Sequence, residues 1–184
     1  MKLGTTSWLT GENFLDNARL VEGRVDFVEL LVYTWDRPMR AKVGSWLDGL
    51  AALDLEYTVH LPTDKVAGAL AVAQFFAESG FPLLNMTLHP LPGWREVDWP
   101  ELVAMENLID QVEFHPRFTF DLTHSLLGKP LPSHFHPHIV DSTFPAPTAR
   151  PITCRLMNTH CSRRCPSSMR KCWSVSKSLT WQTP

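Results

Sequence analysis

The chain has 184 residues, which suits a single domain, and 44% of them are hydrophobic and 20% charged, as in an ordinary globular protein. The net charge of −2 gives no general electrostatic reason to expect binding to nucleic acid or to an anionic membrane. The longest apolar runs are too short or too interrupted to cross a bilayer, and the N-terminus lacks a signal-peptide apolar region, so we expect a cytoplasmic protein.

Strand-like and helix-like segments alternate through residues 1–131. The near-continuous apolar run at 25–34 is typical of a parallel strand buried on both faces. Pro38 suits a first helical turn, and Asp64 can cap the third helix. This alternation predicts right-handed βαβ units and a parallel sheet. The expected strands are 2–8, 25–34, 56–61, 83–89, 102–107 and 118–122. The expected helices are 12–23, one that starts at Pro38 and has its apolar face at 45–54, and 65–79, with a short helix before the fifth strand and a helix or turn at 108–113.

We therefore predict an α/β fold, namely an incomplete (β/α)8 TIM barrel of about six βα units. Closure of such a barrel would need two more strands, and no clear strand is predicted after residue 132. Strand six would then be an exposed edge, with a gap beside strand one, which invites aggregation or pairing with another chain. An inactive truncated barrel fragment is accordingly one alternative for this polypeptide.

Residues 132–184 form a second, aberrant segment that is basic and rich in cysteine. Every Asp and Glu lies at or before Asp141, and the last 43 residues carry seven Lys or Arg and all four cysteines. Three interpretations stay open. The segment is a disordered tail; or it is a zinc knuckle of His160, Cys161, Cys165 and Cys172, without a paired C-x2-C spacing; or the coding frame slips between about 132 and 141. Permitted codons for 152–182, shifted by one base, can encode a helix followed by a strand that ends in Glu.

Five metal-capable side chains stand at the ends of successive predicted strands. Since parallel strands of a barrel gather their C-terminal ends into one mouth, residues far apart in sequence can share an ion there. Imidazole and carboxylate groups are common ligands of zinc, and a carboxylate can bridge two ions. Capping or loop positions are the alternative for each residue alone. The predicted ligands are His60, His89, Glu106, Asp121 and His124, with Glu106 and Asp121 as the catalytic candidates.

Four further residues are candidates for substrate binding. Glu29 lies in an apolar strand, where an unpaired carboxylate is costly, so it either faces the barrel mouth or pairs with a buried base. Trp8, Trp35 and Trp94 follow strands one, two and four and could form an aromatic wall around a large substrate. Core or interface packing is the alternative role for these tryptophans.

The strand-end series resembles the xylose-isomerase-like TIM-barrel superfamily, which includes abasic-site nucleases of the endonuclease IV type (AP endonuclease family 2) and many sugar isomerases and epimerases. In the endonuclease-IV-like branch, a His, His, Glu, Asp-x-x-His series supplies ligands to as many as three zinc ions. The resemblance implies this role for the five residues above. It also implies four further ligands, a His, an Asp and His pair and a Glu, and none is identifiable in the chain as written.

More narrowly, five segments are similar to cobamide-remodelling phosphodiesterases of this superfamily: KLGTTSW, VDFVELLVYTWD, YTVHLPTD, LHPLPGW and FDLTHSLLG. The resemblance implies metal-dependent hydrolysis of a phosphate ester or diester of a bulky small molecule, such as the nucleotide loop of a corrinoid. The alternative is a sugar or sugar-phosphate isomerase or epimerase that uses one divalent ion, often manganese. The absence of a basic groove argues against a nucleic-acid substrate.

Overall fold

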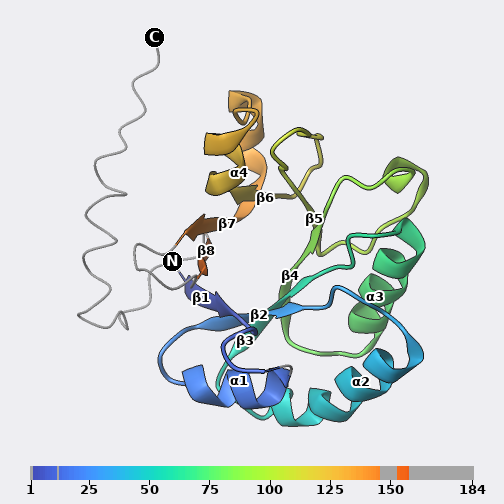
Figure 1. The fold of residues 1–184 in the computed structure, drawn as a ribbon, viewed down its shortest axis with the longest axis vertical. Coiled ribbons are helices and arrows are strands. Elements are labelled where there is room, and N and C mark those ends of the chain that lie inside the picture. The colour runs from blue at the N-terminus through green and yellow to red at the C-terminus, as the bar shows by residue number, and fades with distance from the viewer. Residues whose placement is uncertain (1, 12, 146–152, 158–184) are drawn as a thin grey trace.

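The computed structural model describes residues 2–11, 13–145 and 153–157 (Figure 1). Three βα units come first, and a region with shorter helices follows. The first part comprises β1 (Lys2–Thr6), α1 (Phe14–Val21), β2 (Phe27–Leu31), α2 (Arg37–Ala51), β3 (Glu56–His60), α3 (Val66–Glu78) and β4 (Leu83–Leu88). The second comprises η1 (Trp94–Glu96), β5 (Val103–Glu106), β6 (Phe118–Asp121), α4 (Leu122–Leu127), η2 (Ser133–His138), β7 (Ile139–Pro145) and β8 (Thr153–Met157).

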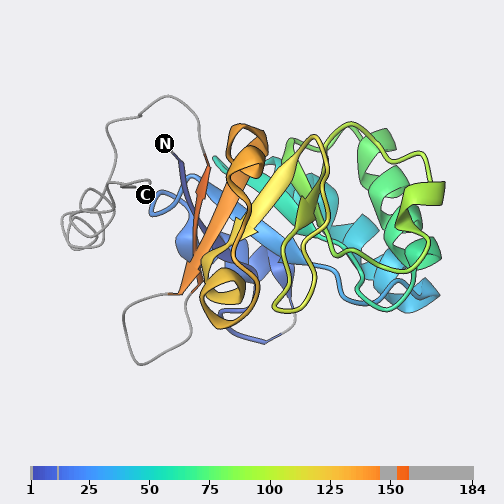
Figure 2. The same cartoon turned by 90° about the horizontal axis from the view of Figure 1, so that it is seen from above.

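The strands β1 to β7 form one curled sheet in which sequence neighbours pair in parallel. The strand β8 runs antiparallel to both β7 and β1 and closes the sheet into a barrel (Figures 1 and 2). Seven parallel strands with intervening helices are consistent with an incomplete α/β barrel. The six predicted strands and the first three predicted helices are confirmed, with their ends shifted by a few residues.

Four elements were not predicted: α4, η2, β7 and β8. The expectation that no strand follows residue 132 is wrong, because β7 pairs with β6, which is therefore not an exposed edge. The strand was missed because it reads IVDSTFP and lacks a continuous apolar run. Its Asp141 and Thr143 are nevertheless buried. The predicted zinc knuckle at 160–172 and most of the frame-shifted segment lie outside the described residues.

Capping residues position the first two helices. The side chain of Asn13 accepts hydrogen bonds from the backbone N–H groups of Leu15 and Asp16 at the start of α1. Asp36 accepts one from Met39 at the start of α2. The prediction that Asp64 caps α3 is wrong, since the N-cap residue is Lys65 and no side chain caps this helix.

The apolar core lies between the sheet and α1, α2 and α3, which cover its outer face (Figure 1). Residues at alternate positions of the strands supply it, for example Leu30, Val59 and Met86, all fully buried. The Tyr57 hydroxyl donates a 2.7 Å hydrogen bond to the carbonyl of Leu50 and ties β3 to α2. Several of the opposite positions carry buried polar groups, such as Glu29, Thr58 and Thr87.

The backbone of Gly4 in β1 packs closely against the ring of Phe27, and a substitution at this position tests that packing. A Cβ atom at this position would overlap the ring of Phe27. We expect Gly4→Ala to lower the free energy of unfolding by about 1–3 kcal/mol, because overpacking forces a buried aromatic ring to move. Gly44→Ala is the matched control: it lies in α2 with open space around it, and should be stabilising by about 0.5–1 kcal/mol. Urea denaturation of both variants measures the difference, and equal effects would contradict the packing.

Among the residues that the structure describes, no helix has the length and apolar character needed to span a membrane.

Candidate metal centre

The predicted ligands lie at one end of the parallel sheet. His60 is the last residue of β3, Glu106 the last of β5 and Asp121 the last of β6. His89 directly follows β4, and His124 lies in the first turn of α4. Since these strands are parallel neighbours, their ends meet at the same rim of the barrel. The fold thus gathers residues that are separated by up to 64 positions in sequence.

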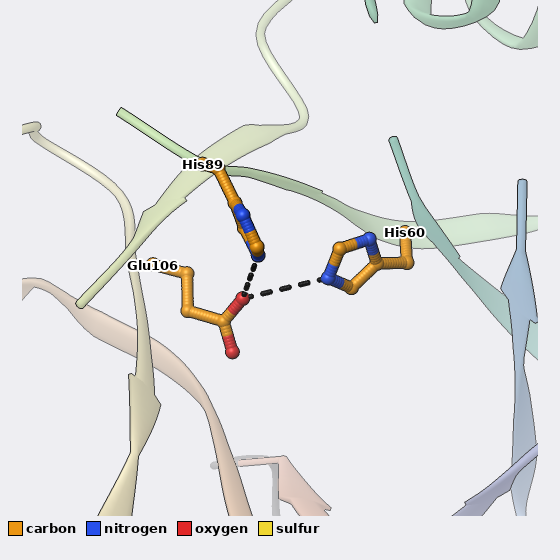
Figure 3. Close-up of side chains that lie close together, drawn as sticks. All are labelled: His60, His89 and Glu106. Carbon is orange, nitrogen blue, oxygen red and sulfur yellow. Dashed lines mark ion pairs between the residues drawn. The ribbon is translucent and has the colours of Figure 1, made fainter. Parts of the chain in front are cut away.

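His60, His89 and Glu106 form one group that could bind a metal ion (Figure 3). The Nε2 atoms of His60 and His89 lie 3.5 and 3.1 Å from the same carboxylate oxygen, Oε2 of Glu106. Two ligands of a tetrahedral zinc ion, each about 2.0–2.1 Å from it, are about 3.3 Å apart. The three side chains point toward one another from neighbouring strands, and their separations fit the ligand set of a small divalent cation.

The tautomer of His60 favours a cation at this point. Its Nδ1 atom lies 3.1 Å from the carbonyl oxygen of Leu61, and a carbonyl can only accept, so Nδ1 carries a proton. In the neutral ring, Nε2 then presents a lone pair toward the Glu106 carboxylate, which is also an acceptor. Two acceptors are stable face to face only with a proton or a metal ion between them. The backbone thus orients the imidazole in the way that metal-binding histidines require.

Glu106 is the electrostatic centre of the site. Only 5% of its surface is exposed, and burial by itself raises the pKa of its carboxyl group. In the metal-free protein a proton takes the place of the cation between these groups, and hydrogen bonds and positive charge from His60 and His89 outweigh the effect of burial and hold the pKa at about 2. The group is therefore an anion throughout the physiological range, as a metal ligand must be.

Glu106, Asp121 and His124 form a second group whose potential ligand atoms lie within 4.8 Å of one another. Asp121 and His124 are held in register because the Asp121 Oδ1 atom accepts a 2.8 Å hydrogen bond from the His124 backbone N–H. Burial, assisted by the charge of Glu106, raises the pKa of Asp121. A cation bound between the carboxylates of Glu106 and Asp121 would attract both and so offset the repulsion between their negative charges. Since Glu106 belongs to both groups, it could bridge two ions.

Asn107 holds the second group in place, although it was not among the predicted site residues. Its side chain accepts a 2.7 Å hydrogen bond from the Asp121 N–H and donates a 2.8 Å bond to the Asp121 carbonyl. The backbone carbonyl oxygen of Asn107 lies 2.8 Å from Nδ1 of His124 and fixes the orientation of that ring. The Leu61 carbonyl has the same relation to His60. The signal was present in the sequence, since an amide directly follows a ligand at a strand end.

The other predicted site residues are distributed differently. Glu29 is buried in β2 opposite Thr58 and belongs to neither metal group. Trp35 packs on Phe75 of α3, with ring centroids 5.0 Å apart. Trp94 packs near His115 and under the guanidinium of Arg95. These contacts give Trp35 and Trp94 packing roles.

Trp8 contacts Tyr33, and Tyr33 contacts His60, so this tryptophan is connected through Tyr33 to the candidate metal site. Tyr33 was not among the predicted residues, although it also follows the end of a strand. Burial, together with the charge of Glu106, raises the pKa of its phenol.

Comparison of the chain with protein-family models, with curated proteins and with solved structures found no match.

Proposed function

We propose that this fold supports metal-dependent hydrolysis of a phosphate ester or diester. The observation that carries the proposal is that one buried carboxylate, Glu106, belongs both to a His, His, Glu group and to a Glu, Asp, His group. Neutral imidazole and carboxylate ligands suit zinc, with manganese as the second choice. A metal ion held there would polarise phosphoryl oxygens and lower the pKa of water.

Each residue has a definite task in this proposal. His60 and His89 would hold one ion, with His60 oriented by the Leu61 carbonyl. Asp121 and His124 would hold a neighbouring ion, and Glu106 would be a ligand common to both groups. The histidine-rich set favours hydrolysis over isomerisation, for which carboxylates move a substrate proton.

The finer parts of the proposal rest on the family resemblance. They are that the fold is a partial xylose-isomerase-like TIM barrel and that the substrate is a bulky small molecule, with the nucleotide loop of a corrinoid as the leading candidate. The ligands expected after strand six would lie in the region from 132 onward, most of which falls outside the described residues.

The proposal is tested by reconstituting the full chain with Zn²⁺ or Mn²⁺ and following hydrolysis of bis(p-nitrophenyl) phosphate. We expect protein-bound metal by elemental analysis and turnover that a chelator abolishes and added metal restores. Turnover that survives the chelator, or a chain that binds no metal at millimolar excess, would overturn the proposal. Metal binding with isomerisation of a sugar phosphate and no ester cleavage would assign the centre to the isomerase class instead.

The two groups should lose metal separately. We expect His89→Ala and His124→Ala each to remove about one equivalent of zinc, because each histidine belongs to only one of the groups. His136→Ala is the matched control, since that histidine is exposed in η2 and belongs to neither group. Zinc content measured by atomic emission after extensive dialysis gives the stoichiometry. If either site variant loses all its zinc, the ions are not held independently.

A further inference from the structure

Six side chains follow one another around the rim of the barrel in strand order. Trp8 lies two residues after β1, and Tyr33 lies two residues after β2. His60, His89, Glu106 and Asp121 come next, from the ends of β3, β4, β5 and β6. The strands pair as parallel neighbours in this same order. The rim therefore has an aromatic part that leads directly into the metal-binding part.

The rings along this rim are in continuous contact. Ring centroids of Trp8 and Tyr33 are 5.5 Å apart, those of Tyr33 and His60 are 5.2 Å apart, and those of His60 and His89 are 4.9 Å apart. All three contacts are edge-type, with interplanar angles of 83°, 65° and 78°. A molecule held by His60 and its neighbours would thus lie beside the aromatic pair.

The outer ring of this series is open to solvent. Trp8 is 60% exposed and Tyr33 is 38% exposed, whereas Trp35 and Trp94 are partly buried in packing contacts. An indole is large and mostly apolar, so exposure of its face to water is unfavourable in free energy. Edge-type contact with Tyr33 does not remove that cost, because most of the Trp8 surface remains accessible. A flat ring laid on it would remove that surface from water.

The chemistry of the row limits what binds there. Its six members include no lysine or arginine, so they offer no side-chain charge for a second phosphate or a carboxylate. The metal-binding part would take a phosphoryl group, and the adjacent part offers the rings of Trp8 and Tyr33 together with the Tyr33 hydroxyl. Stacking of planar rings on an exposed tryptophan is favourable and tolerant of ring identity.

We propose that Trp8 and Tyr33 form a platform for a planar aromatic or heteroaromatic ring that the phosphate ester carries next to its phosphoryl group. The inference rests on the proposed function, because the metal centre anchors the phosphoryl end. It selects among substrates: an aryl or nucleoside-like phosphate is favoured over an aliphatic or sugar phosphate of similar charge.

Binding of three phosphonates to the zinc-loaded full chain tests the platform without requiring turnover. By calorimetry, we expect 2-naphthylphosphonate to bind about tenfold more tightly than methylphosphonate or cyclohexylphosphonate, because a planar ring stacks on an exposed aromatic side chain. A tenfold preference corresponds to about 1.4 kcal/mol. In Trp8→Ala the preference should fall to about twofold or less. Trp8→Phe, which keeps a flat ring, should retain most of it.

Leu127→Ala is the matched control, because Leu127 is 70% exposed and lies in α4, outside the row. It should keep the tenfold preference. Equal binding of the three phosphonates, or a preference for naphthyl that survives Trp8→Ala, would overturn the platform while leaving the proposed function intact. Cyclohexylphosphonate as strong as naphthyl would show that the patch selects apolar bulk and not planarity, which also overturns it. Failure of all three to bind the zinc-loaded chain would overturn the proposed function itself.

Discussion

Replacing Glu106 by glutamine should abolish the metal centre and the reaction together. Glutamine keeps the shape of the side chain but removes the negative charge that both ligand groups share. Loss of partners that only orient metal ligands already costs about 10–100-fold in affinity or activity, so loss of the shared ligand should cost about 100-fold or more. Elemental analysis of dialysed protein and the initial rate of bis(p-nitrophenyl) phosphate hydrolysis measure both effects.

Glu96→Gln is the control for the charge change, because Glu96 is exposed in η1 and belongs to neither metal group. It should retain full metal content and activity. Glu106→Asp keeps the negative charge on a side chain that is shorter by one methylene group. The activity of this variant should therefore lie between those of wild type and Glu106→Gln. The shared role of Glu106 is contradicted if Glu106→Gln still binds two equivalents of zinc, or if its turnover stays within about threefold of wild type.

The placement of these ligands was predictable because strand order and strand direction can both be read from the sequence. Alternation of apolar strands with amphipathic helices implies parallel pairing, and parallel pairing places His60, His89 and Glu106 at one rim. The prediction depended only on where each strand ends. A shift of one or two residues in a boundary, as at β3 and β4, left the ligands at the same rim.

The residues that support the site were harder to predict, since their roles depend on contacts between strands. Asn107 is recognisable only once its hydrogen bonds to Asp121 and His124 are known. Tyr33 was passed over in favour of Trp35, because periodicity does not show which aromatic residue after β2 faces the rim and which packs on α3. Such choices depend on the local path of the chain after each strand.

The strand β7 was missed for a related reason. Hydrophobic periodicity identifies strands with a sustained apolar face, and the only large apolar residues in the β7 segment IVDSTFP are Ile139, Val140 and Phe144. Asp141 and Thr119 are opposite each other in β7 and β6, and both are buried. A strand with an aspartate at a buried position reads as a loop in the sequence. The buried carboxyl group of Asp141 also affects the stability of the protein.

Asp141→Asn should stabilise the metal-free protein, and more strongly as the pH rises. Burial, helped by the charge of Glu106, raises the pKa of Asp141 to about 8 against hydrogen bonds from Ser142 and Asn85. Between about pH 4 and pH 8 the unfolded chain has released this proton and the folded protein has kept it. Since the unfolded state binds fewer protons there, the free energy of unfolding falls as pH rises through that window. Asparagine has a similar shape but does not titrate, so Asp141→Asn removes this decrease in the free energy of unfolding.

The expected gain is roughly 4 kcal/mol at pH 7, from about 1.4 kcal/mol per pKa unit, and it should be roughly 3 kcal/mol larger at pH 7.5 than at pH 5. Urea denaturation in a chelating buffer at the two pH values measures this difference. Asp110→Asn, at an exposed position, should give the same free energy of unfolding as wild type at both pH values. A gain for Asp141→Asn that does not change with pH would mean that the carboxyl is ionised in the folded state. The interior of the barrel beneath the ligands would then be polar enough to hold a second buried anion beside Glu106.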